Sequence, residues 1–290
     1  MFTVVTDTSA NLPSSLVRAY DLYVIPFSYY IDGKEYTQPD PDAFDGVTFF
    51  NQIRNGMKVS TSLINVQSYL DHFEPLAAAG QDILFVSMSS GVSGSYSAAT
   101  LAAQTVMEDY PSCHIRTVDT LGASLGEGFL ALEAVKLRDQ GKTLDETADA
   151  LEQLRWRMCQ VFTVDDLMHL KRTGRLSGAK ATLGTVLNIK PTLKGNMEGK
   201  IVQIGQVRGR KKSLLELARV YNQYVVDPEN QTVGIAHAGC PEDAVFLINE
   251  LNKTKPPKDI LTVMYEPVTG SHVGPSTLAL FFYGNPEFRL

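Results

Sequence analysis

The sequence predicts an α/β protein of two α/β domains, the N-terminal one built on a doubly wound, largely parallel sheet. In the first half of the chain, short strands that are apolar on both faces alternate with segments of helical period. The length of 290 residues is about twice the ~150 residues of one typical domain. After Cys159 the amino-acid composition changes, and Gly, Lys and Arg become frequent. We therefore expect an N-terminal domain over residues 1–158 and a C-terminal domain over residues 159–290.

In the N-terminal domain each apolar strand is followed by turn residues and then by a helical pattern. The strands are expected at residues 2–6, 23–30, 83–88 and 114–118, with a turn at Asp32-Gly33. The helices are expected at residues 7–20, 42–55, 67–79, 94–108, 126–140 and 144–155. This β-then-α rhythm favours parallel strands joined by crossover helices.

The C-terminal domain has shorter apolar segments between its charged residues. We expect strands at residues 161–164, 200–206, 232–237 and 261–265, helices at 165–172, 211–225 and 241–251, and a closing apolar segment at 276–282.

Composition excludes several classes of protein. Hydrophobic residues make up 44% and charged residues 20%, which is typical of a globular chain and not of a disordered one. Apolar runs fall well short of the ~20 residues that span a bilayer, and the N-terminus lacks a basic leader, so we expect no membrane insertion and a cytoplasmic location. Cys113, Cys159 and Cys240 are far apart and lack metal-ligand spacing, so neither a disulfide scaffold nor a metal site is expected.

Positive charge is concentrated in one segment. Residues 171–212 hold eleven Lys or Arg and a single acid, Glu198, a local charge of +10, while the whole chain carries −6. Such a segment indicates an anionic partner, although a solvated face that also complements helix termini would give the same pattern.

The stretch from Ser89 to Ser95 is rich in Ser and Gly and lies between a predicted strand and a predicted helix. Free N–H groups at a helix N-terminus, close-approach glycines and hydroxyl donors together favour anion binding. The stretch matches neither the Walker A loop nor the dinucleotide fingerprint, and helix capping with a tight turn is the alternative.

Three further turns are rich in hydroxyl groups: Asp7-Thr8-Ser9, Val59-Ser60-Thr61-Ser62, and the segment from Asp119 to Gly128. Any one of them is a common helix cap. Because ligands bind at the carboxyl ends of parallel strands, their number and shared position predict one polar edge.

These segments resemble the DegV family of bacterial fatty-acid-binding proteins, and the resemblance covers nearly the whole chain. The motifs that carry it are Thr6-Asp7-Thr8-Ser9-Ala10-Asn11-Leu12-Pro13, Ser60-Thr61-Ser62, Ser89-Ser90-Gly91-Val92-Ser93-Gly94-Ser95-Tyr96, Val118-Asp119-Thr120 with Ser124, Gly126 and Gly128, the run from Asp166 to Ser177, Arg208-Gly209-Arg210-Lys211-Lys212, and Thr269-Gly270-Ser271-His272-Val273-Gly274-Pro275.

The resemblance implies two α/β domains with one long-chain fatty acid buried between them. It implies a non-catalytic, lipid-carrying subunit of bacterial fatty acid kinase, in phospholipid metabolism, that presents the carboxylate to a separate ATP-dependent kinase for acyl-phosphate formation. The implied partners are the fatty acid and the kinase catalytic subunit; no cofactor, metal or nucleic acid is expected.

Carried over by motif, the resemblance also implies site residues. Thr61, Ser62, Ser93, Gly94 and His272 would bind the fatty-acid carboxylate, with Gly94 supplying an N–H.

Four arginines would face the phosphate or the kinase: Arg172, Arg175, Arg208 and Arg210. Two departures from the family pattern concern the path of the loops. The family often has Thr-Ser-Gln-Pro after the Ser60 position, whereas here Leu63-Ile64-Asn65 follows Thr61-Ser62. Gly274-Pro275-Ser276 replaces the commoner Gly-Pro-Gly.

Among the five histidines, His272 lies in a predicted Gly/Ser/Pro loop and is the functional candidate. The other four are interpreted as core, edge or helix-surface residues, and none suggests a metal.

Two other functions remain open. A serine esterase or acyltransferase could use Ser93 as nucleophile and His272 as base, oriented by Asp119 or Asp166, but Gly91-Val92-Ser93-Gly94 lacks the spacing of a nucleophile elbow. Nucleic-acid binding could use the basic segment, although no helix-turn-helix, zinc finger or aromatic RNA platform is present in the sequence.

Overall fold

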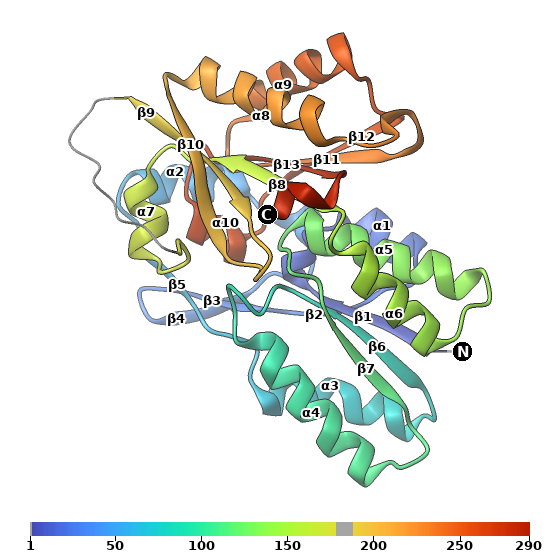
Figure 1. Cartoon of the computed structure of the whole chain (residues 1–290). Coiled ribbons are helices and arrows are strands. Elements are labelled where there is room, and N and C mark those ends of the chain that lie inside the picture. The colour runs from blue at the N-terminus through green and yellow to red at the C-terminus, as the bar shows by residue number, and fades with distance from the viewer. Residues whose placement is uncertain (1, 178–187) are drawn as a thin grey trace. The chain divides into compact units, whose positions relative to one another are not determined.

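The computed structural model describes residues 2–177 and 188–290 (Figure 1). The chain forms two compact units, Met1–Phe44 with Val59–Arg155, and Asp45–Lys58 with Trp156–Leu290. The units differ from the expected division at residue 158 chiefly in Asp45–Lys58, which groups with the second unit. The reason is packing: the Phe50 side chain lies so close to Gly239 and Gly270 that an added Cβ on either would touch it, at 3.3 and 2.6 Å.

The first unit is built on the expected parallel sheet, with strand order β2-β1-β6-β7. Its strands are β1 (Phe2–Asp7), β2 (Tyr23–Ile25), β6 (Asp82–Ser87) and β7 (Ile115–Asp119). All three neighbouring pairs are parallel. The strands β1 and β6 are buried almost throughout because helices cover both faces of the sheet.

Helices cover this sheet on both sides. The helices of the unit are α1 (Ser14–Ala19), α3 (Val66–Ala78), α4 (Ser95–Asp109), α5 (Leu125–Asp139) and α6 (Leu144–Leu154). The pair α3 and α4 packs on one face and the pair α5 and α6 on the other (Figure 1). The sheet is therefore doubly wound, as expected.

The expected single strand over residues 23–30 is wrong. These residues form two strands, which belong to different sheets. Strand β2 ends at Ile25, and β3 (Ser28–Ile31) pairs with β4 (Lys34–Thr37) and β5 (Val59–Thr61) in a small antiparallel sheet. Pro26 separates the two strands because proline has no N–H for a ladder. The turn at Asp32-Gly33 is confirmed, with positive φ at both residues (51° and 78°), as a tight hairpin turn requires.

The expected helix over residues 7–20 is also interrupted. Residues Thr8–Ala10 form a single 3-10 turn, Asn11 is left-handed with φ of 56°, and the helix proper begins only at Ser14, after Pro13. The remaining short 3-10 turns among the described residues are Pro41–Ala43, Pro228–Asn230 and Pro286–Arg289.

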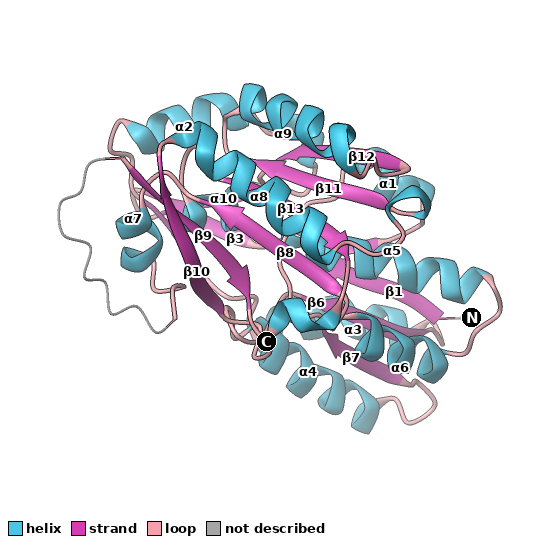
Figure 2. Ribbon diagram, turned by 45° about the horizontal axis from the view of Figure 1, so that its top comes forward, coloured by secondary structure: helices cyan, strands magenta, loops and turns pink. Residues whose placement is uncertain are grey.

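The second unit has a six-stranded mixed sheet of order β10-β9-β8-β13-β11-β12 (Figure 2). The strands are β8 (Met158–Thr163), β9 (Ile189–Gly195), β10 (Ile201–Arg208), β11 (Thr232–His237), β12 (Asp259–Met264) and β13 (Leu278–Tyr283). The helices are α2 (Gly46–Arg54), α7 (Leu167–Arg172), α8 (Arg210–Tyr224), α9 (Pro241–Thr254) and α10 (Pro267–Val273). Leu217, Leu247, Val233 and Leu280 belong to one buried core, which joins α8 and α9 to the sheet.

Two elements of this unit were not expected from the sequence. Strand β9 pairs with β10 as an antiparallel hairpin within the basic segment. Residues 267–273, expected as a Gly/Ser/Pro loop, are helix α10, so the loop placement of His272 is wrong. Glu266 caps this helix, because its carboxylate accepts the N–H groups of Val268 and Thr269 at 2.6 and 2.5 Å.

Candidate functional site

The Ser/Gly-rich loop leaves β6 and leads into α4, as the sequence predicts. The Ser93 hydroxyl accepts the N–H of Ser95 at 3.2 Å and donates to the Ser95 hydroxyl at 2.9 Å. Ser93 thereby binds the first N–H of the 15-residue helix α4, whose N-cap residue is Gly94 and whose N-terminal N–H groups carry the positive end of the helix dipole. The loop therefore fits both interpretations of the sequence, helix capping and anion binding.

Gly94 is the first residue of this helix terminus and is exposed. Its φ and ψ of −77° and −2° are open to any residue, and an added Cβ would lie 3.2 Å from Cδ2 of the exposed Leu63 side chain, a tight contact with the end of a flexible group. Within residues 2–177 and 188–290 no acceptor takes the Gly94 N–H. An unpaired donor at the start of a long helix is the arrangement that binds a carboxylate or phosphate oxygen.

Thr61, the last residue of β5, and Ser62 after it lie next to the start of α4. Thr61 stands opposite Tyr29 in the small sheet, and Ser62 N–H donates to the Ser28 carbonyl at 3.5 Å. Immediately after them, Ile64 N–H donates to the Ser95 hydroxyl at 3.2 Å. This bond and the Leu63 contact with Gly94 join the two predicted carboxylate-binding segments.

The turn after β7 is hydrogen-bonded to the Ser/Gly-rich loop that follows β6. The Asp119 carboxylate accepts N–H groups from Ser90 and Leu121 at 3.2 and 3.0 Å, and Ser89 N–H donates to the Gly122 carbonyl at 2.7 Å. Three of the four hydroxyl-rich turns expected at one edge are thus linked by hydrogen bonds. Asp119, a proposed orienting acid for an esterase, has its Oδ1 occupied by backbone donors.

Glu127 is a polar residue of this edge that sequence reasoning missed. Glu127 lies in α5 and is fully buried. Asp7, at the end of β1, and Ser9, in the turn after it, are fully buried too. The Ser9 hydroxyl contacts Asp7 Oδ1 and also Glu127 Oε2, the latter at 2.8 Å. Burial raises the pKa of Asp7 to about 7, against the lowering effect of the Ser9 hydrogen bonds. The available signal was an acid flanked by Gly126 and Gly128 in the otherwise apolar first half of the helix, Leu125–Leu132.

His272 lies in the second unit, on α10, close to two other basic groups. Burial, and then the charge of Arg175 and the proximity of His169, lower the pKa of His272 to about 3. His169 Nε2 contacts the Ser271 carbonyl at 2.7 Å, and Thr173 Oγ1 donates to the His272 carbonyl at 3.2 Å. A neutral imidazole of such low pKa is a poor general base near neutral pH, which disfavours the esterase alternative.

The four predicted partner-facing arginines have different environments. Arg172 is exposed and paired with Asp166 at 3.0 Å, and Arg208 is exposed at the end of β10. Arg175 donates to the Thr173 carbonyl at 2.7 Å, and burial lowers its pKa. Lys180, in the same basic segment, lies outside the described residues.

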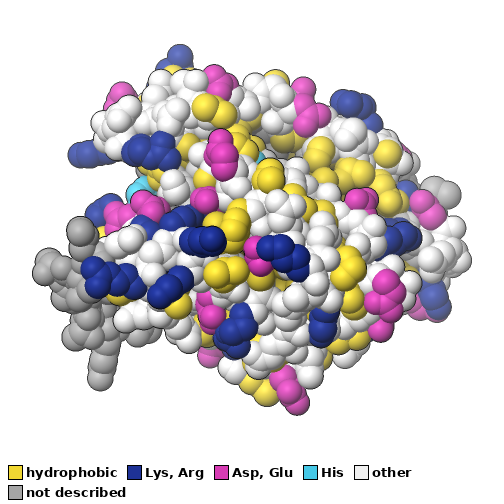
Figure 3. Space-filling view, turned by 90° about the horizontal axis from the view of Figure 1, so that it is seen from above, with side chains coloured by type: hydrophobic (Ala, Val, Ile, Leu, Met, Phe, Trp, Pro, Cys, Tyr) yellow, Lys and Arg dark blue, Asp and Glu magenta, His cyan; other side chains and the backbone are white. Residues whose placement is uncertain are grey.

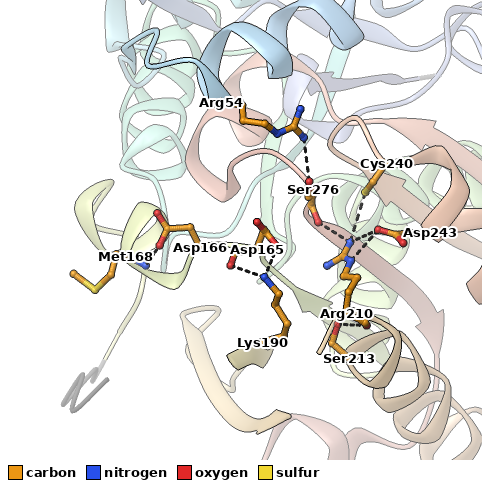
Figure 4. A network of polar contacts seen from close by, with 10 residues as sticks. All are labelled: Arg54, Asp165, Asp166, Met168, Lys190, Arg210, Ser213, Cys240, Asp243 and Ser276. Atoms are coloured by element: carbon orange, nitrogen blue, oxygen red, sulfur yellow. Dashed lines mark hydrogen bonds and ion pairs between the residues drawn. The ribbon is translucent and has the colours of Figure 1, made fainter. Parts of the chain in front are cut away.

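Arg210 is held within its own unit, as Figure 4 shows. Its guanidinium binds Asp243 at 2.8 Å and the Ser276 carbonyl at 2.6 Å. Ser276 has a left-handed φ of 61°, the conformation for which glycine is favoured, and its hydroxyl accepts a bond from Arg54 at 3.1 Å. Arg210 therefore braces this loop, which is where the sequence departs from the common Gly-Pro-Gly.

The surface view shows how the charges are distributed. On the face in Figure 3, Lys and Arg side chains are interspersed with acidic and apolar ones.

In the described part of the chain, no helix is long and apolar enough to cross a membrane. The same residues contain no group of three or more His, Cys, Asp or Glu side chains that could hold a metal ion.

The fold and the loop together define a class: an α/β protein of two compact units with a Ser/Gly-rich loop and an open helix terminus at the carboxyl edge of a parallel sheet. A family model described as an uncharacterised protein of the DegV family matches residues 1–285. The chain belongs to the DegV family.

Known relatives match this chain in sequence or structure over nearly its whole length. A DegV domain-containing protein of Clostridium perfringens is 38% identical over 286 residues, covering 99% of this chain and 98% of the relative. A solved DegV family protein from Thermus thermophilus, described as fatty acid binding, is 29% identical with a TM-score of 0.85, over 98% of this chain and 99% of that one. A fatty acid binding DegV family protein from Streptococcus agalactiae is 27% identical with a TM-score of 0.84, over 98% and 99%.

Proposed function

We propose that this protein binds one long-chain fatty acid in a buried tunnel and presents its carboxylate to a separate ATP-dependent kinase, which forms the acyl phosphate. The observation that carries the proposal is the joining of residues 61–64 to residues 93–95 around an unpaired N–H at the start of α4. The fatty-acid-binding relatives from Thermus thermophilus and Streptococcus agalactiae support the choice of ligand.

The protein supplies binding and orientation, and the kinase supplies the chemistry. A chain of some fourteen methylenes gains on the order of 10 kcal/mol on burial, at ~0.8 kcal/mol each, before ordering costs. The polar end then needs to orient the carboxylate rather than provide most of the affinity. Because the kinase step consumes ATP, we place this function in the cytoplasm.

At the carboxylate we assign the hydroxyls of Thr61, Ser62 and Ser93 and the N–H of Gly94 as donors. For His272 we propose a neutral hydrogen-bond donor, because its pKa of about 3 keeps it uncharged at physiological pH. A neutral donor orients the carboxylate without neutralising it, and so leaves it nucleophilic.

At the partner-facing surface we assign Arg172, Arg175 and Arg208. Arg172 and Arg208 are exposed, and their charge can attract an acidic protein surface or a phosphate. We assign Arg210 to bracing the Ser276 loop, because Asp243 and Ser276 already bind its guanidinium.

Mass spectrometry of lipid extracted from the purified protein tests the ligand. We expect one long-chain fatty acid per chain without added lipid, and markedly less in a Thr61→Val, Ser93→Ala double variant. The matched control is Ser97→Ala, which removes an exposed hydroxyl from the next part of the same helix. Correctly folded preparations that repeatedly contain no acyl chain would overturn the proposal.

A further inference from the structure

Helix α10, which carries His272, ends among buried residues of the second unit. The last carbonyl groups of an α-helix have no partners inside the helix, and burying such a group without a hydrogen bond costs free energy. The Gly274 N–H makes the final helical bond, to the Gly270 carbonyl at 2.9 Å. Three carbonyls follow, those of residues 271–273. The Thr277 hydroxyl donates to the last of them at 2.9 Å, and the other two need donors from another element.

Helix α7 and its C-cap residue Thr173 supply both donors. His169 Nε2 lies 2.7 Å from the Ser271 carbonyl oxygen. The Thr173 hydroxyl divides one hydrogen between the Leu170 and His272 carbonyls, at 3.0 and 3.2 Å. Residues four apart lie on the same face of a helix, so His169 and Thr173 reach α10 side by side. The end of α10 is therefore capped by a different helix, chiefly through the shorter and undivided bond of His169.

His169 is held in one orientation by its surroundings. A carbonyl oxygen only accepts hydrogen bonds, so the hydrogen of the neutral ring is on Nε2. The ring also lies against Gly274, where an added Cβ would stand 2.8 Å from His169 Cδ2 and 3.2 Å from Nε2. Ser271 and Gly274 lie on either side of His272 in the chain. The half-buried ring of His169 thus contacts the backbone both before and after His272.

We propose that His169 is a positioning residue, whose Nε2–H, together with the Thr173 hydroxyl, fixes the end of α10 and so sets the direction in which His272 presents its imidazole to the fatty-acid carboxylate. The second half of this statement rests on the proposed function of His272. The run from Asp166 to Ser177 then has a role besides that of its arginines.

The physical basis is the shortness of α10. The helix has seven residues, and isolated helices of fewer than ~12 residues are marginally stable in water. Without the His169 donor, the buried Ser271 carbonyl would lack a hydrogen bond, and unwinding the last turn would let it find one. His272 lies in that turn. Its side-chain direction would change with the backbone while the rest of the unit stays folded.

NMR of the imidazole nitrogens tests the positioning without any ligand. Neutral His169 should carry its hydrogen on Nε2, and His169→Phe should shift the ring signals of His272. His169→Gln should keep them near their wild-type positions, because the glutamine amide places a donor close to where Nε2 lies. The matched control is His114→Phe, the same change at an exposed histidine of the first unit, which should leave the His272 signals unmoved. A wild-type His169 with its hydrogen on Nδ1 alone would overturn the proposal.

Thr173→Val removes the second donor and serves if His169→Phe does not fold. Its control is Thr254→Val at the end of α9, because Thr254 also donates to the carbonyl three residues earlier, that of Leu251, at 3.5 Å. The His272 signals should move in Thr173→Val and stay in Thr254→Val. Unmoved His272 signals in both His169→Phe and Thr173→Val would also overturn the positioning role.

Oleate labelled with carbon-13 at its carboxyl group tests the consequence for the ligand. His272→Phe should shift the carboxyl signal of the bound oleate, His169→Phe should shift it in the same direction, and His169→Gln should restore it. A signal that moves in His272→Phe but not in His169→Phe would overturn the positioning role. A signal that does not move in His272→Phe, or a protein that binds no oleate, would refute the proposed function instead, and the imidazole spectra would still decide whether His169 holds the end of α10.

Discussion

Gly128 is the position at which one methyl group should disturb the candidate site most. It lies in α5 beside Glu127, and an added Cβ would stand 2.5 Å from the Ala10 carbonyl oxygen and 2.9 Å from Leu12 Cδ2. The first neighbour is backbone of the turn that carries Ser9, so it cannot move without displacing that turn. Gly128→Ala should therefore push α5, and Glu127 with it, away from the turn that carries Ser9.

The magnitude follows from two opposing effects. Replacing glycine by alanine inside a helix stabilises it by about 1 kcal/mol. Overpacking against fixed neighbours costs about 1–3 kcal/mol, and the backbone contact here places Gly128→Ala at the upper end. We expect the free energy of unfolding to fall by about 2 kcal/mol.

Urea denaturation followed by circular dichroism measures this change. The matched control is Gly205→Ala on β10, where an added Cβ would lie 3.9 Å from Thr192, an ordinary contact, and should change stability by less than about 0.5 kcal/mol. If Gly128→Ala were as stable as the wild type, the close approach of α5 to the Ser9 turn would not be the reason for glycine at this position.

Three further predictions follow from the site. The pKa of Asp7 is raised from 3.8 to about 7 on folding, so stability should fall as the pH rises from about 4 to 7 and then level off; Asp7→Asn should flatten this dependence in denaturation curves measured across that range. Thr61→Val and Ser93→Ala should each weaken binding of a fluorescent fatty acid by roughly 1.5–3 kcal/mol, because each removes a hydrogen bond to an anion, and unchanged affinity would place the carboxylate elsewhere. Arg172→Glu should reduce kinase-dependent acyl-phosphate formation while extracted lipid stays at the wild-type amount, and equal loss of both would refute the docking role.

Much of the first unit could be predicted from sequence because its signals are local. Segments such as Asp82–Ser87 are apolar at nearly every position, which is typical of strands covered on both faces, and the Ser and Gly residues after them mark a turn into a helix. The loop of Ser93 and Gly94 follows from the same local pattern. The whole-chain resemblance to the DegV family is confirmed by the match to residues 1–285.

Other features were missed because local signals compete or are weak. The strand β9 carries Lys190 and Lys194, whose charges mask its pattern although both side chains are largely buried. Helix α10 contains Gly270 and Ser271, which predict a loop, yet the cap from Glu266 and packing against α2 and α7 stabilise it. In both cases tertiary contacts outweigh propensity.

The sequence by itself determined the fold class, the family and the polar turns at the ends of the strands, because each depends on residues that are close together in the sequence. Only the tertiary structure decided which distant residues meet. Asp7 and Glu127 are 120 positions apart and share one hydroxyl group, and Asp45–Lys58 leaves the first half of the chain to pack with the second unit. No local pattern specifies such pairs, since burial of apolar surface selects a complete arrangement of elements and the long-range polar contacts follow from it.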